Sequence, residues 1–74
     1  MKRYLFNIEL SYIECENLYI SSVKTVVVRA TTGERVQIPS IRLRPFVEPS
    51  GIKGTFCLTV NSENKIQSFK RIDG

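Results

Sequence analysis

The sequence predicts a small α+β protein. Its strands are expected to form a five-stranded, strongly twisted antiparallel sheet or a partly open small barrel, covered at one side by one short helix. Three observations lead to this prediction: apolar and polar residues alternate along most of the chain, one short segment has helical spacing, and glycine-containing turns separate the strand-like runs. The chain has 74 residues, which is enough for one small core, so residues 1–74 are expected to form a single domain. The expected order of elements is β-α-β-β-β-β.

The first strand is predicted from RYLFNIEL, residues 3–10. Its apolar side chains recur at every second position and so share one face: Tyr4, Phe6, Ile8 and Leu10. Polar residues lie between them, with Leu5 as the exception on the outer face. This pattern is typical of a strand with one buried face.

A helix is predicted over residues 12–19. Ser11 and Glu14 have the spacing of a capping box, in which each side chain satisfies a backbone N–H of the other residue. The residues expected on its buried face are at helical spacing: Tyr12, Cys15 and Tyr19, with Leu18 beside them. The helix is expected to end at the two serines that follow.

The stretch VVVRATTGERVQI predicts a hairpin, and the apolar pattern selects its register. A two-residue loop would pair valines with polar residues. A three-residue loop, residues 31–33, puts Gly33 in the left-handed position of a G1 bulge and pairs Val28 with Val36. The same register places Arg29 opposite Arg35 on the outer face.

The segment PSIRLRPF, residues 39–46, fits two conformations, a strand or one helical turn capped by Ser40. In both, Ile41 and Leu43 are expected to point inward. The loop VEPSGIKG follows, and its glycines precede no helix, so they do not indicate a phosphate-binding loop.

Two further strands complete the chain. GTFCLTVN directs Phe56, Leu58 and Val60 inward, and KIQSFKRI is the last strand. Its apolar pattern slips between Ile66 and Phe69, which indicates a bulge or a frayed edge.

The arginines are the candidate functional residues. Like charges directly opposite each other in a sheet destabilise it by up to about 1 kcal/mol, so the facing pair in the hairpin needs an offset. Two sources are open: an acidic side chain of the protein, or an external anion matching the planar fork of arginine. The acidic candidates are Glu9, Glu34 and Glu48.

Two more arginines follow the hairpin. Arg42 and Arg44 are expected to face solvent, and Pro45 favours an extended backbone at Arg44. The candidate nucleic-acid-binding residues are therefore Arg29, Arg35, Arg42 and Arg44. Aromatic stacking on bases is an alternative use of Phe69, which lies beside two basic residues, whereas Phe46 is expected in the core.

The charge distribution favours an anionic partner. The formal net charge is +4. Residues 1–16 carry two basic side chains against three glutamates, a net of −1, and the remainder carries nine basic against four acidic side chains, a net of +5. A basic sheet region is suited to a polyanion.

Most enzyme chemistry is excluded by composition. There is no histidine, so the most common acid–base group near neutral pH is missing, and no Ser–His or Cys–His pair can form. Cys15 and Cys57 lack the spacing of a zinc site, and Cys57 is expected on the outer face of its strand. We therefore expect no enzymatic activity, no cofactor and no metal.

The start of the chain and its apolar pattern indicate a cytoplasmic protein. MKRYLFNIEL has no uninterrupted apolar run and no cleavage signal, and no stretch of the chain is long and apolar enough to span a membrane. The two cysteines then correspond to reduced thiols packed as small apolar groups.

Several motifs together resemble an uncharacterised family of short basic bacterial proteins, known mainly from proteobacteria as a domain of unknown function. The motifs are SYIEC with its following tyrosine, VVVRATTGERVQIP, LRPFV and GIKGTF. The resemblance covers nearly the whole chain and implies a bacterial cytosolic protein. It implies no activity, ligand or catalytic residue.

Two functions follow as hypotheses. The first is a non-enzymatic module that binds an anionic polymer, the backbone of RNA or DNA, through the four arginines. The second is a protein-interaction or self-association module, such as a homodimer, in which exposed apolar positions or the last strand, KIQSFKRI, pair with another chain. The positions expected to be exposed in that case are Leu5, Val27 and Phe69.

Overall fold

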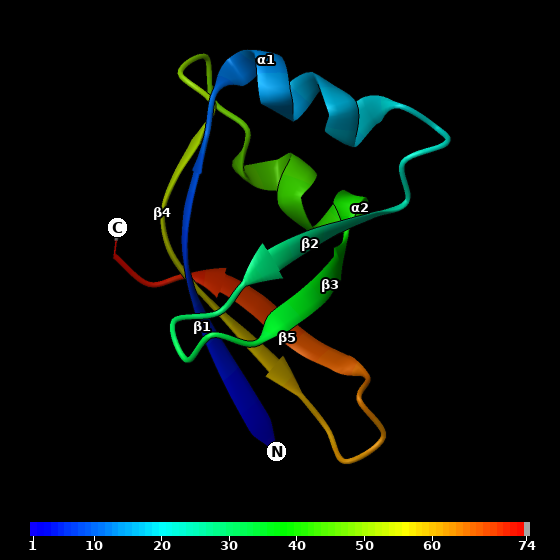
Figure 1. Ribbon diagram of the computed structural model, residues 1–74, viewed down its shortest axis with the longest axis vertical. Coiled ribbons are helices and arrows are strands. Elements are labelled where there is room, and N and C mark those ends of the chain that lie inside the picture. The colour runs from blue at the N-terminus through cyan, green and yellow to red at the C-terminus, as the bar shows by residue number, and fades with distance from the viewer. Residues whose placement is uncertain (74) are drawn as a thin grey trace.

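The computed structural model describes residues 1–73, which form five strands and two short helices, each helix continued by a 3₁₀ turn (Figure 1). In chain order the elements are β1 (Lys2–Leu10), α1 (Tyr12–Cys15), η1 (Glu16–Tyr19), β2 (Thr25–Arg29), β3 (Arg35–Pro39), α2 (Ser40–Leu43), η2 (Arg44–Phe46), β4 (Ile52–Val60) and β5 (Ile66–Arg71). The α+β class and five antiparallel strands are confirmed.

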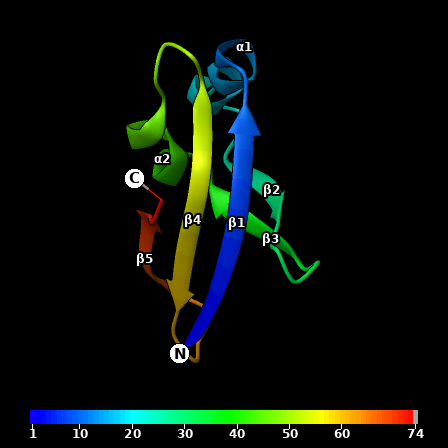
Figure 2. The same cartoon turned by 90° about the vertical axis from the view of Figure 1, so that its left-hand side faces the viewer.

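The prediction of one five-stranded sheet or barrel is wrong. The strands form a three-stranded sheet in the order β1-β4-β5 and a separate β2-β3 hairpin. Views along two directions place the hairpin against the inner face of the three-stranded sheet (Figures 1 and 2). One backbone hydrogen bond connects the hairpin to the three-stranded sheet: the N–H of Thr31 donates to the carbonyl of Leu5 at 2.7 Å. Alternation shows that each strand has one buried face, but it does not say which surface covers that face.

The core lies between the two sheets and the helical segments. In the ladder between β1 and β4, Phe6 pairs with Phe56 and Tyr4 with Leu58, so the expected inner face of β1 is confirmed. The rings of Phe56 and Phe69 stack at 5.3 Å between centroids, and Phe46 meets Phe56 edge-on at 5.0 Å. Because Phe69 is buried in this cluster, the expectation that it is exposed, and with it base stacking on Phe69, is wrong.

The first helix begins as predicted but buries a different face. Both hydrogen bonds of the capping box between Ser11 and Glu14 are present. Cys15 and Leu18 are buried, whereas Tyr12 and Tyr19 are exposed, contrary to the prediction. For Tyr19 the cause is the change to a 3₁₀ turn after Cys15: with three residues per turn, Leu18 follows Cys15 on the buried face and Tyr19 does not.

The hairpin has the predicted register. Val28 pairs with Val36 and Arg29 with Arg35. Gly33 has a φ of 96°, the left-handed conformation that the three-residue loop requires. The bulge in the last strand is also confirmed, since Thr59 pairs with Ser68 but Val60 with Ile66.

A second helix was one of two open alternatives for residues 39–46, and it adds to the single helix of the predicted fold. Ser40 does not cap it by its side chain; the Ser40 hydroxyl instead donates to the carbonyl of Val23 at 3.1 Å, and its backbone N–H donates to that of Lys24 at 2.9 Å. Leu43 is buried as expected, but Ile41 is exposed, so its inward placement was wrong. A single turn of helix directs one of these residues inward and cannot direct both.

Candidate nucleic-acid interface

The outer face of the β2-β3 hairpin presents two arginines side by side. Arg29 and Arg35 are direct cross-strand partners, and both are exposed. Side chains at such positions have Cβ atoms about 5 Å apart. The valines of the opposite face pack on the core, and this packing keeps the two guanidinium groups on the solvent side.

The acidic residues nearest in the chain are engaged elsewhere. The Glu34 carboxylate accepts a hydrogen bond from the Thr32 hydroxyl at 2.7 Å and lies 3.4 Å from the Lys2 ammonium. These two contacts, the Thr32 hydrogen bond first, lower the pKa of Glu34. Glu48 pairs with Arg71 at 3.5 Å. Within residues 1–73 no ion pair involves Arg29 or Arg35, so the protein supplies no direct carboxylate partner for their charges.

Arg42 does not join this pair. It is exposed on α2, which begins at the end of the hairpin opposite its turn (Figure 1). Four residue steps of strand, roughly 13 Å, separate Arg35 from Pro39, where the hairpin ends. Arg42 is therefore a positive charge separate from the arginine pair.

Arg44 was predicted to face solvent, and this prediction is wrong. Its side chain is half-buried, its Nε–H donates to the carbonyl of Leu18 at 2.7 Å, and its guanidinium lies 5.4 Å from the centre of the Tyr19 ring. The backbone of Arg44 is helical, with φ −52° and ψ −43°, although Pro45 favours an extended conformation there. The 3₁₀ turn η2 directs the Arg44 side chain towards η1, and its contacts there connect the two helical segments.

A groove beside Arg35 was not predicted. It has a volume of about 490 Å³ and runs between the hairpin and the inner face of the three-stranded sheet. Its lining combines apolar side chains with amides and one arginine: Tyr4, Thr25, Arg35, Val36, Gln37, Pro39, Leu58, Val60, Asn64 and Ile66. These residues come from all five strands and the turn between the last two strands, so no local pattern in the sequence indicates them.

Lys2 adds a positive charge at this end of the molecule. Its ammonium lies 5.1 Å from the centre of the Tyr4 ring. A hydrogen bond to Tyr4 and another to Glu34 raise the pKa of Lys2. Lys2 thus connects β1 to the turn of the hairpin next to the groove.

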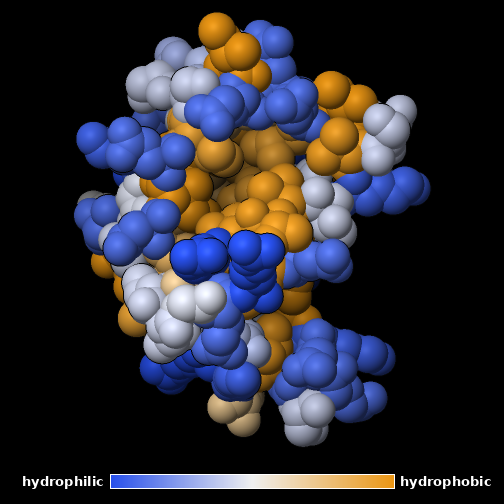
Figure 3. All heavy atoms as spheres, in the orientation of Figure 1, coloured by the Kyte–Doolittle hydropathy of each residue, from blue (hydrophilic) through white to orange (hydrophobic). Residues whose placement is uncertain are grey.

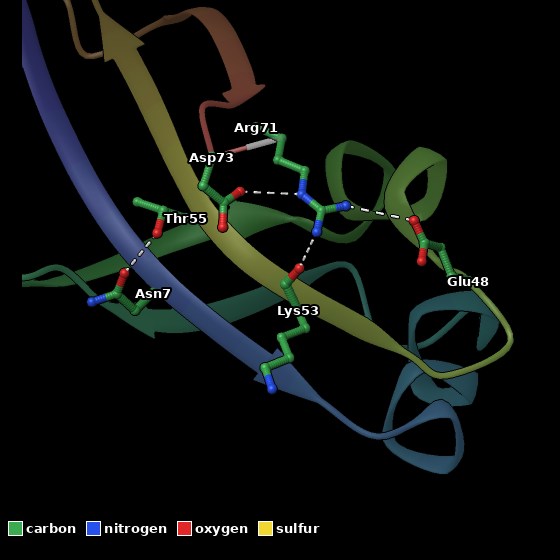
Figure 4. A network of polar contacts seen from close by, with 6 residues as sticks. All are labelled: Asn7, Glu48, Lys53, Thr55, Arg71 and Asp73. Carbon is green, nitrogen blue, oxygen red and sulfur yellow. Dashed lines mark hydrogen bonds and ion pairs between the residues drawn. The ribbon is translucent and has the colours of Figure 1, made fainter.

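Arg71 was also not singled out by the sequence, and it is enclosed by partners (Figure 4). Its guanidinium donates to the carbonyl of Lys53, lies 3.5 Å from Glu48 and donates through Nε to Asp73 at 3.2 Å. Partial burial pushes the pKa of Asp73 upward, but hydrogen bonds from the Thr55 backbone and from Arg71 hold it below its ordinary value. Gly54 leaves room for this arrangement, because a Cβ there would lie 2.8 Å from Nε of Arg71.

The other candidate chemistries are quickly described. Cys15 is a buried free thiol whose pKa is raised by burial, and Cys57 is a half-buried free thiol on the outer face of β4. In residues 1–73 no group of three or more Cys, Asp or Glu side chains is arranged to hold a metal ion. No helix in the same range is long and apolar enough to cross a membrane.

Comparison with known proteins identifies a family without an assigned activity. No curated protein matches the chain, and no solved structure matches it. The family described as "Protein of unknown function (DUF2835)" matches residues 2–72, nearly the whole chain. The resemblance seen in its motifs is thereby confirmed, and the chain belongs to the DUF2835 family.

Proposed function

We propose that this protein is a non-enzymatic module that binds RNA or DNA by its phosphate backbone, through Arg29 and Arg35. One observation carries the proposal: two arginines face each other on an exposed surface, and within residues 1–73 neither has an ion-pair partner. A phosphate between two guanidinium groups offsets their repulsion and accepts hydrogen bonds from both.

Arg42 and Arg44 contribute less to the proposed interface than the arginine pair. Arg42 is exposed and is a second, more distant contact for a long polyanion. Arg44 is held by Leu18 and Tyr19, so we leave it out of the interface. A cytoplasmic location, where nucleic acid is accessible, belongs to the same proposal.

Salt-dependent binding tests the proposal. Fluorescence anisotropy with a labelled oligonucleotide of mixed sequence is measured over a range of salt concentrations, for the wild type and for the Arg29→Ala/Arg35→Ala double variant. Each neutralised phosphate contributes about 0.9 to the slope of log affinity against log salt, and the two arginines share one phosphate, so the double variant is expected to flatten the slope by about 0.9.

A charge-matched control separates a site from net charge. Lys53→Ala/Lys70→Ala removes two exposed positive charges from the outer face of the three-stranded sheet, away from the hairpin. Its slope is expected to change little. An equal change of the slope in both double variants would mean that binding depends on net charge alone. Wild-type binding by the arginine variant would show that the proposed interface is wrong.

The rival function is self-association or binding of another protein. Val27 is 56% exposed on the hairpin, and Ile41 is 65% exposed in a groove of about 470 Å³ whose lining includes Pro45 and Phe69. Around this region the surface shows an apolar hollow between hydrophilic side chains (Figure 3). A dimer mass in solution that Val27→Glu or Ile41→Glu abolishes would favour this function, and a monomer at high protein concentration would count against self-association.

A further inference from the structure

The groove between the hairpin and the three-stranded sheet has the mixed lining of a site for a partly polar group. Its floor is apolar, formed by Leu58, Val60 and Ile66 with the half-buried ring of Tyr4. Its volume of about 490 Å³ is within the range of small-molecule sites, and its lining is divided evenly between polar and apolar surface. An apolar floor favours a group that gains from leaving water.

Two amide side chains line the groove from different elements. Gln37 lies on β3, and Asn64 lies in the turn between β4 and β5. An amide offers both a donor and an acceptor, which is the combination that the edge of a nucleic-acid base requires. Asn64 makes no side-chain hydrogen bond within residues 1–73, nor does Gln37, so both amides are available to a ligand.

Arg35 joins this groove to the arginine pair. It lines the groove and is also the cross-strand partner of Arg29. The one acid next to it in sequence, Glu34, is engaged by Lys2 and Thr32. If Arg29 and Arg35 hold a phosphate, the nucleotide attached to it lies next to the groove, close to the positive charges of the two arginines.

We propose that the groove accepts one unpaired base, which makes the ligand a single-stranded nucleic acid. This inference rests on the proposed function, because the arginine pair supplies the phosphate contact. In a duplex the bases are stacked and their pairing edges are occupied, so a base can enter the groove only from a single strand or at the cost of unpairing.

An abasic ligand provides the sharpest test. Three labelled probes of equal length, about twelve nucleotides, are compared at one salt concentration: a mixed-sequence single strand, the same strand in a duplex, and a strand in which the central nucleotides are abasic. The abasic strand keeps its phosphates and lacks the bases. We expect the mixed single strand to bind at least about fivefold tighter than the other two.

Variants of the two amides locate the effect. Asn64 has a φ of 62°, so Asn64→Gly removes its amide without backbone strain. Asn64→Gly and Gln37→Ala are each expected to reduce the preference for the mixed strand over the abasic strand by about threefold or more while leaving abasic binding unchanged. Ser62→Gly, an exposed change in the same turn, is the control and should leave the preference intact.

The outcomes distinguish the two proposals. If all three probes bind equally and the arginine variant weakens all three, the phosphate interface holds and base insertion is overturned. If the mixed strand is preferred but neither amide variant reduces the preference, the groove is not the base site. If no probe binds, the proposed function itself fails, and the groove proposal fails with it.

Discussion

The arginines of the hairpin and the arginine at the end of β5 show two different uses of one residue type. Arg71 reaches a backbone carbonyl and two carboxylates, all from its own chain. Arg29 and Arg35 face each other without an ion-pair partner in residues 1–73. An arginine whose donors are used within the fold is expected to serve stability, whereas an arginine pair that repels itself is expected to serve an external anion.

The largest effect is expected where the Arg71 arrangement is displaced. A Cβ at Gly54 would lie 2.8 Å from Arg71 Nε and 2.9 Å from an Asp73 oxygen. Gly54→Ala should lower the free energy of unfolding by about 2–4 kcal/mol, since it combines backbone strain with loss of these contacts. Denaturant unfolding measures the change.

Gly33→Ala is the matched change in the hairpin turn. Gly33 also has a positive φ, but nothing lies within 4 Å of a Cβ there. Its cost should be limited to backbone strain, about 1–2 kcal/mol. A Gly54→Ala variant no less stable than Gly33→Ala would contradict the structural role of the Arg71 contacts.

Removal of Arg71 itself should have the next largest effect. Arg71→Met is expected to lower the free energy of unfolding by about 1–2 kcal/mol, because a charge-assisted hydrogen bond to the Lys53 carbonyl is lost while the partly exposed ion pairs contribute little. Nucleic-acid affinity of the folded variant should stay within about twofold of wild type. A loss of affinity as large as that of the Arg29→Ala/Arg35→Ala variant would contradict the different roles assigned to the two regions.

A charge reversal in the hairpin should act in the opposite direction. Arg35→Glu replaces a repulsive cross-strand pair with an attractive one and should raise the free energy of unfolding by about 0.5–1 kcal/mol while weakening nucleic-acid binding. Arg35→Gln removes only the repulsion and should give a smaller increase. Thermal unfolding of both variants in low salt checks this order, and a destabilised Arg35→Glu would mean that Arg35 has an unrecognised stabilising contact.

The smallest effect is the acid dependence of the two regions. Asp73 and Glu34 both have a lowered pKa in the folded protein, so their ionised forms favour folding. Their contributions are fully present above the ordinary carboxyl values of about 4 and are lost as the pH falls through the lowered values. Thermal unfolding from about pH 6 to about pH 2 should therefore show a shallower decline for Asp73→Asn and for Glu34→Gln than for wild type. An unchanged decline in either variant would contradict the contribution of that carboxylate.

Features that depend on neighbouring residues were predicted well. The capping box depends on residues three apart, and the hairpin register depends on a glycine in a short loop and on the valines around it. The slip between Ile66 and Phe69 likewise marked a real bulge. In each case the deciding interactions lie within a few residues, where periodicity and turn geometry act.

Features that depend on which surfaces meet were predicted less well. Arg44 was expected in solvent because the neighbouring Leu43 was expected to point inward, but its partner Leu18 lies 26 residues away. Phe69 was ambiguous in sequence and is buried by rings from β4 and η2. The groove beside Arg35 combines residues from both sheets, so no single stretch contains its signal.

The amino-acid order alone determined the strands, the cap of the first helix and the outward direction of Arg29 and Arg35, because each follows from local geometry and from one apolar face per strand. Only the tertiary structure decided that the hairpin stands apart from the other three strands, that Arg44 and Arg71 are held within the fold, and that a groove opens next to Arg35. Those outcomes depend on how apolar faces of distant segments cover one another, and periodicity reports that a face is buried without naming the surface that buries it.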